Sequence, residues 1–357
     1  MIYSCQGANR TPPSYRQCYS AKNYFQLTSS FYKTIIFRMN SWSGLKQYNK
    51  IFLLFFLVLV LSSLLAPLIK AILDTLLTSS PFIKSLLNFK QESYDFGRVM
   101  RRIMMAVAIL LIFFLRKPLK IGSLIMSGIK PIRGWRKQLQ TGFLLGTGMF
   151  VIYVAILWLS GIQTFRPDTR SFADIVVRLL TLILIAGLVG GIEELLFRGF
   201  IFQSMLVDMR AVSAIAISSL FFSSLHFFKV KYLVSSGIQP FIGFIIIYQS
   251  FKYIVIDFVA IWPALIGLFL VGAVLSYSCL RTKSLYLAIG LHAGWVFLMK
   301  TNKLLFDHHA GKHFEWLFGD HYIVTGVLGW IFLLFTFILI RFITKATYHG
   351  KDPARAF

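Results

Sequence analysis

Two adjacent glutamates, Glu193 and Glu194, stand at the end of an apolar run that begins near Asp174 and is long enough to cross a bilayer. A carboxylate near the bilayer centre costs about 2.5–3.5 kcal/mol on insertion scales, so an acid at this depth points to function. On a helix, Glu194 and Arg198 are one turn apart and can pair. Glu193 points about 100° away from Glu194 and lacks that partner. Helix geometry therefore predicts one carboxylate supported by an arginine and one that is free for chemistry.

Two histidines lie in other apolar runs, His226 at the end of Phe222-Ser223-Ser224-Leu225-His226 and His292 further along the chain. A single histidine in a membrane helix often serves only to hydrogen-bond a neighbouring helix. Two histidines together with a glutamate pair favour chemistry instead. A carboxylate and an imidazole that converge can activate water for attack on a carbonyl, and a second imidazole can hold the oxyanion.

The same residue types also permit a metal site. Two histidines and one glutamate are a known zinc ligand set, but the sequence lacks the HExxH pattern, so zinc is the weaker interpretation. A second group, Asp307-His308-His309 with His313, also has a spacing that could bind metal. It falls in a segment expected outside the membrane, away from the glutamates, where a solvated loop is the simpler interpretation.

The motifs resemble those of the CAAX-protease and bacteriocin-processing family, also called the Abi or type II CAAX endopeptidase family. Glu193-Glu194-x-x-x-Arg198 matches its EExxxR motif, Phe222-x-x-x-His226 its FxxxH motif, and His292 the histidine of its third motif. The resemblance covers about residues 175–300. It implies an intramembrane glutamic endopeptidase without a cofactor.

The resemblance also implies individual roles. Glu193 is the expected base, His226 its partner in activating water and His292 an oxyanion donor, while Glu194 and Arg198 support the site. One position departs from the family: Val296 stands where an asparagine is expected, and valine cannot donate a hydrogen bond. The Trp295 indole or a serine of the His226 segment is an alternative donor; loss of the donor would slow or abolish the reaction.

The composition indicates the elements that must position these residues. Hydrophobic residues make up 57% of the 357 and charged residues only 14%, against about a quarter in soluble domains, and the mean hydropathy is +0.71. We therefore predict an all-α polytopic transmembrane bundle with about eight spans. The expected spans are 51–69, 99–115, 141–161, 175–198, 212–228, 258–280, 284–300 and 322–343. Residues 70–97 are expected to be an outside loop, and 229–257 an interfacial or re-entrant segment.

The net charge of +24 is concentrated in loops. Residues 116–140 hold seven Lys or Arg and no acid, whereas 162–175 is balanced, so the positive-inside rule places the first loop in the cytoplasm. Both termini are then cytoplasmic. No nucleic-acid-binding motif accompanies the charge, which excludes that class of partner.

The expected organisation is a basic N-terminal segment (1–50), a transmembrane domain (51–345) with a catalytic core at 175–300, and a basic tail (346–357). Met39 is an alternative start of translation. The expected location is a bacterial inner membrane, with lipid and a protein or peptide substrate at the cytoplasmic leaflet as partners. Three alternatives remain open: a zinc-dependent protease, a non-enzymatic immunity or interaction protein, and a transporter, although no internal repeat supports the last.

Overall fold

The computed structural model describes residues 45–79, 94–115, 128–129, 131–166, 171–228, 231–234, 237, 239–309, 314–319 and 324–344. The expectations for most of the N-terminal segment, for Met39 and for the tail lie outside the described residues. So do His313 and most of the basic loop between 116 and 130.

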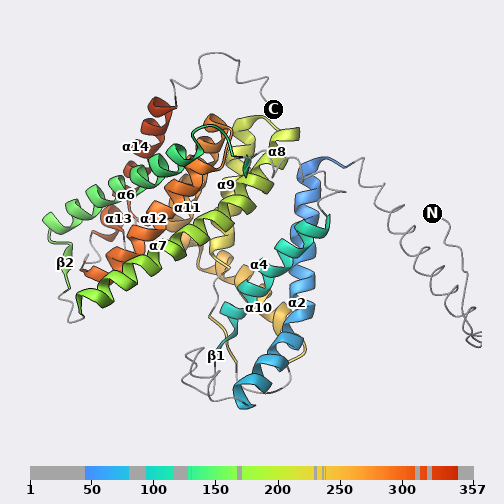
Figure 1. Cartoon of the computed structure of the whole chain (residues 1–357). Helices are drawn as coiled ribbons and strands as arrows, with labels where there is room; N and C mark the ends of the chain where they lie inside the picture. The colour runs from blue at the N-terminus through green and yellow to red at the C-terminus, as the bar shows by residue number, and fades with distance from the viewer. Residues whose placement is uncertain are drawn as a thin grey trace, which may run out of the picture. The chain divides into compact units, whose positions relative to one another are not determined.

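Helices make up almost all of the described chain (Figure 1). They are α2 (Gln47–Ser79), α4 (Phe96–Leu115), α6 (Trp135–Leu159), α7 (Phe172–Glu194), the π-helix η2 (Leu195–Phe202), α8 (Gln203–Asp208), α9 (Ala211–His226), α10 (Ile242–Ile256), α11 (Phe258–Thr282), α12 (Tyr286–Leu305), α13 (Glu315–Phe318) and α14 (Val327–Ile343). Two short antiparallel pairs join β1 (Tyr94–Asp95) to β3 (Leu233–Val234) and β2 (Gln163–Phe165) to β4 (Phe306–His308).

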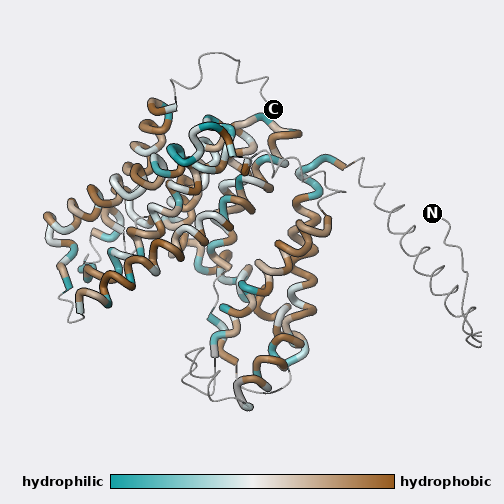
Figure 2. The backbone as a smooth tube through the Cα atoms, viewed as in Figure 1, coloured by the Kyte–Doolittle hydropathy of each residue, from teal (hydrophilic) through white to brown (hydrophobic). Residues whose placement is uncertain are grey.

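The arrangement of polar and apolar side chains is that of a membrane protein. Arg198 and Lys70 are among the largest fully buried side chains, while α7 exposes Leu180, Leu184 and Leu188. Apolar residues predominate along most of the helices (Figure 2). Such a surface is suited to lipid and not to water. Within the described residues, four helices are long and apolar enough to cross a membrane: Gln47–Leu76, Trp135–Leu159, Phe172–Asp208 and Phe258–Thr282. The predicted all-α membrane bundle is thus confirmed.

Several predicted span boundaries differ from the structure. The first span was expected to end at residue 69, but α2 continues to Ser79 because Lys70 makes a 2.7 Å ion pair with Asp74 inside the helix and donates to the Gly237 carbonyl. These contacts satisfy the lysine in a buried place. The segment expected outside the membrane therefore begins as a continuation of this helix, and its location stays a prediction.

The fourth span is longer than predicted, and the fifth is shorter. The helix that holds the glutamates runs without a break from Phe172 to Asp208 instead of ending at 198. In contrast, α9 has 16 residues, about 24 Å at 1.5 Å per residue, less than the roughly 30 Å of a hydrocarbon core. The apolar α10 has only 15 residues, within the segment expected to be interfacial or re-entrant. The count of eight spans stays a prediction.

Glycines bring α6 and α12 into close contact. Gly142 and Gly146 on α6 face α12, and Gly290 and Gly294 on α12 face α6, so each helix carries a GxxxG pattern. A Cβ at Gly290 would collide with the Leu139 carbonyl oxygen, and one at Gly294 would lie 2.7 Å from the Phe143 carbonyl oxygen. Small residues allow membrane helices to approach each other in this way. The contact fixes the part of α12 that carries His292.

The long helix changes its winding just after the glutamates. The π-helix η2 starts at Leu195, directly after Glu194, and its residues from Arg198 to Phe202 are all buried. π-Helical turns occur often at functional sites because they re-aim side chains that a regular α-helix would direct elsewhere. Here η2 places Arg198 against α11, where it donates to the Gly272 carbonyl. The same glycine allows α9 to pack closely against α11, because a Cβ added to Gly272 would lie only 2.9 Å from the Cβ of Ser219.

Candidate active site

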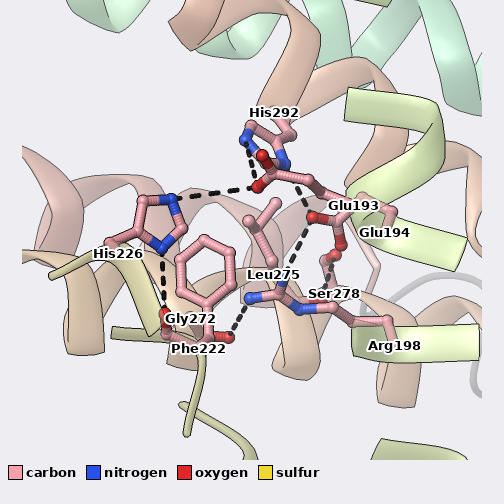
Figure 3. A network of polar contacts seen from close by, with 9 residues as sticks. All are labelled: Glu193, Glu194, Arg198, Phe222, His226, Gly272, Leu275, Ser278 and His292. Carbon is pink, nitrogen blue, oxygen red and sulfur yellow. Dashed lines mark hydrogen bonds and ion pairs between the residues drawn. The ribbon is translucent and has the colours of Figure 1, made fainter. Parts of the chain in front are cut away.

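The structure brings together all five predicted site residues from three segments of the chain (Figure 3). Glu193 and Glu194 end α7, Arg198 lies in η2, His226 ends α9, and His292 lies in the first half of α12. The short α9 brings His226 to the level of the glutamates, and the α6–α12 contact holds His292 opposite them.

Glu194 is the centre of a buried hydrogen-bond network. Its carboxylate is completely buried, and Oε1 accepts a 2.9 Å hydrogen bond from Arg198 and a 2.7 Å one from His292 Nδ1. Arg198 also donates to the Gly272 carbonyl at 3.2 Å and lies 4.5 Å from the centroid of the Phe222 ring. The predicted Glu194–Arg198 pair is therefore present, and it orients a histidine as well.

Glu193 faces both histidines instead of the arginine. Its Oε2 lies 3.9 Å from Nε2 of His226 and 3.9 Å from Nε2 of His292. This oxygen is buried and accepts no hydrogen bond from a described residue, although the side chain is 20% exposed. The two glutamates therefore have different surroundings: Glu194 is enclosed and bonded, and Glu193 is open to further contact.

Hydrogen bonds at the far nitrogens orient both imidazoles. His226 Nδ1 lies 2.9 Å from the Phe222 carbonyl oxygen, which can only accept, so Nδ1 carries the proton. His292 Nδ1 donates to Glu194. In a neutral ring whose Nδ1 is protonated, Nε2 carries a lone pair. Both Nε2 atoms thus point toward Glu193, where each can bind a water or, when protonated, donate a hydrogen bond.

A cavity of about 870 Å³ opens onto these three side chains. Glu193, His226 and His292 line it together with apolar residues from the first half of α11 and the second half of α12, among them Ala264, Leu268 and Met299. This volume and lining are typical of a site for a small molecule or a short peptide.

The cavity lining bears on the missing asparagine. Trp295 and Val296 both line the cavity, so the expected donor position faces the site but holds an apolar side chain. The serines of α9 are not among the described lining residues, and Ser218 and Ser223 donate to carbonyls of their own helix. Of the alternative donors that the sequence suggests, Trp295 is the one among the described lining residues.

The second histidine cluster is a hydrogen-bonded connection between strands. Asp307 pairs with Arg166, His308 bonds Gln163 across β2 and β4, and His309 bonds Thr164 at 2.8 Å. None of the described cluster residues lines the cavity. Throughout the described part of the chain, no group of three or more His, Cys, Asp or Glu side chains has a metal-binding arrangement.

Several important groups were missed at the sequence level. The Gly272 and Phe222 carbonyls satisfy Arg198 and orient His226, but backbone acceptors leave no mark on the sequence. The Phe222 ring contributes a cation–π contact to the arginine. The paired GxxxG patterns that position His292 were detectable as motifs.

Among models of known protein families, one matches the part of the chain that contains these residues. The family model described as "Type II CAAX prenyl endopeptidase Rce1-like" matches residues 174–298, a range that holds all five candidate site residues and is close to the 175–300 covered by the resemblance in the sequence. No curated protein and no solved structure matches the chain. Residues 174–298 of this helical membrane protein therefore form a domain of the Rce1-like type II CAAX endopeptidase type, and the members of that family are peptidases.

Proposed function

We propose that the protein hydrolyses peptide bonds of membrane-associated substrates with a water activated by Glu193 and His226. The observation that carries the proposal is the unpartnered Glu193 Oε2, which lies 3.9 Å from two Nε2 atoms. His226 Nε2, in a ring that carries its proton on Nδ1, and the Glu193 carboxylate are both acceptors, so a donor between them is needed to join them. A water molecule is such a donor, and the cavity gives a substrate access to it.

In the proposed reaction, Glu193 accepts a proton from this water while the water oxygen attacks the substrate carbonyl carbon. The π electrons of the carbonyl move onto its oxygen, and the resulting oxyanion accepts a hydrogen bond from His292 Nε2. His292 can donate there only as an imidazolium, because its Nδ1 proton is already committed to Glu194. When the tetrahedral intermediate collapses, the C–N bond breaks and the proton held by Glu193 passes to the leaving amine.

Glu194 and Arg198 act as positioning residues in this proposal. The Glu194 carboxylate accepts a hydrogen bond from His292 and fixes the orientation of its ring, and Arg198 pairs with that carboxylate in a buried place. Trp295 is the proposed second oxyanion donor in place of the asparagine that Val296 replaces.

We further propose that cleavage takes place in the leaflet nearer the cytoplasm. Tyr286 at the start of α12 bonds the Ile129 carbonyl, in the basic segment expected in the cytoplasm. His292 follows six residues later, about 9 Å along the helix. The proposed location is a bacterial inner membrane with both termini in the cytoplasm, and the proposed chemistry requires no metal.

The test is proteolysis by the purified full-length protein in lipid nanodiscs, with membrane-anchored peptides as substrates and mass spectrometry of the products. We expect cleavage that a strong zinc chelator leaves unchanged. Activity that the chelator removes and zinc restores would replace the glutamate–histidine mechanism with the zinc alternative. If no peptide in a broad panel is cleaved, the protein is a non-enzymatic member of the family.

A further inference from the structure

The start of α2 and the turn from α8 to α9 meet at a junction that has no role in the proposed reaction. The backbone N–H of Gln47, in the first turn of α2, donates to the carboxylate of Asp208, the last residue of α8. The two helices pack against each other at this level (Figure 1). Residues 46–50 and 208–210, far apart in the sequence, therefore lie together.

Lys50 is a buried cation at this junction. The residue is only 3% exposed, yet its side chain makes no ion pair or hydrogen bond within the described part of the chain. The Lys50 nitrogen is not among the described buried polar atoms that lack a partner, so it reaches the surface. A buried cation is normally paired, because its removal from water is costly. The stem of Lys50 is thus enclosed, and its charge is open to an external anion.

Two further cations lie beside Lys50. Lys46 is one helical turn before it, and Arg210 follows Asp208 by two residues. Both are exposed, and neither makes an ion pair with a described residue. Residues 1–73 contain no Asp or Glu, so the N-terminal part of the chain has no acidic side chain to offer. Three cations therefore face the single carboxylate of Asp208, which already accepts a backbone bond.

We propose that Lys46, Lys50 and Arg210 bind the phosphate of an anionic phospholipid. A guanidinium can bind phosphate oxygens with two parallel hydrogen bonds, and lysine adds adaptable point charges. The junction belongs to segments expected on the cytoplasmic side, where anionic headgroups attract basic residues close to the membrane. The site is separate from the cavity that holds Glu193 and does not depend on the proposed reaction.

Exposed apolar residues beside the cations favour a phospholipid over a free phosphate ion. Phe52, Leu53 and Phe56 are exposed in the next two turns of α2, and Val207 and Val212 are exposed on either side of the turn from α8 to α9. A free phosphate ion contacts only the charged groups. A phospholipid also covers this apolar surface with its acyl chains, which adds a hydrophobic contribution to binding.

The bound lipid should also stabilise the protein. A phosphate that bridges Lys50 and Arg210 joins α2 to the end of the continuous helix Phe172–Asp208, which carries Glu193 and Glu194. A ligand that binds the folded state and not the unfolded state raises the melting temperature. Lipid affinity and melting temperature are therefore two independent measures of the same site.

The binding test is native mass spectrometry of the full-length protein in a neutral detergent, titrated with phosphatidylglycerol or with phosphatidylcholine of the same acyl chains. Each basic residue near an anionic surface adds about 1 kcal/mol, or about fivefold, so we expect phosphatidylglycerol to bind at least about tenfold more tightly. The combined Lys50→Gln and Arg210→Gln variant should lose this preference. If it does not fold, Arg210→Gln alone, at an exposed position, should still weaken binding about fivefold.

The matched control removes the same charge elsewhere. Arg133 and Lys137 are exposed basic residues near the start of α6, and neither makes an ion pair with a described residue. The combined Arg133→Gln and Lys137→Gln variant should change phosphatidylglycerol affinity less than about twofold, since exposed charges away from the site are screened. An equal loss in both double variants would overturn the site, because the attraction would then come from the general surface charge.

A stability crossover tests whether Lys50 lacks its partner when no lipid is present. Lys50→Met buries no charge, so in neutral detergent it should melt higher than wild type. Phosphatidylglycerol should raise the melting temperature of wild type more than that of Lys50→Met. A Lys50→Met protein that melts lower than wild type without lipid, and gains as much from it, would overturn the proposal. Inorganic phosphate that stabilises wild type as much as phosphatidylglycerol would contradict the lipid assignment.

Discussion

The buried Glu194–Arg198 pair gives the most detailed prediction. Arg198→Ala removes a hydrogen bond to a completely buried carboxylate, a bond to the Gly272 carbonyl and a cation–π contact with Phe222. An ion pair broken by removal of one partner typically costs about 3–5 kcal/mol, because the remaining charge stays buried. We expect Arg198→Ala to lower the free energy of unfolding by at least about 3 kcal/mol.

Replacement of both partners should cost less than replacement of one. The combined Glu194→Leu and Arg198→Met variant buries no charge, but it leaves the Nδ1 donor of His292 unpaired, at a cost of about 1–3 kcal/mol. The double variant should therefore be about 2 kcal/mol more stable than Arg198→Ala, since an unpaired neutral donor costs less than an unpaired charge. It should remain inactive, because His292 has lost its positioning partner.

The assay is denaturant unfolding of both variants in one detergent, with Arg133→Ala as the control, since Arg133 is exposed and makes no ion pair with a described residue. The control should unfold like wild type. The reasoning is refuted if Arg198→Ala stays within about 1 kcal/mol of the control, or if the double variant is the less stable of the two.

Three further predictions concern the donor position, the helix contact and the topology. Val296→Asn restores an oxyanion donor at the cavity and should raise kcat by about tenfold or more, as donor deletions cost about 100- to 1000-fold; an unchanged kcat would show that the position does not contact the oxyanion. Gly290→Ala should lower both melting temperature and activity because its Cβ meets backbone atoms of α6, whereas Gly148→Ala, where a Cβ meets open space, should not; equal effects would contradict the packing account. Tags at residue 128 and at the C-terminus should be cytoplasmic and a tag near 168 should not, and protease protection that puts 128 and 168 on one side would contradict the alternating topology.

The sequence predicted the site better than the helices that carry it. The Glu194–Arg198 pair follows from helix periodicity alone, and the shared motifs led to the two histidines. The contact of His292 Nδ1 with Glu194 depends on how α12 packs against α7, which no local pattern encodes. Periodicity therefore predicts pairs within one helix, while partners on different helices need the fold.

Helix ends were predicted less well because hydropathy indicates which residues can lie within the hydrocarbon core, whereas a helix can continue beyond it. In α2, for example, Lys70 was expected to begin the segment outside the membrane, yet it is buried within the helix with Asp74 as its partner. The π-helical turn after Glu194 has no recognised sequence signal. The sequence therefore could not predict the buried position in which this turn places Arg198.

The central claim is that Glu193 performs the chemistry and Glu194 supports it. The most direct measurement compares the cleavage rate of Glu193→Gln and Glu194→Gln in the same nanodiscs, with melting temperatures as a check on folding. Glu193→Gln should lose all measurable cleavage while it melts near wild type, because its Oε2 bonds no described residue. Glu194→Gln should melt lower, because it weakens the bonds to Arg198 and His292. A Glu193→Gln protein that cleaves at the wild-type rate, beside a stable and inactive Glu194→Gln protein, would contradict the assignment.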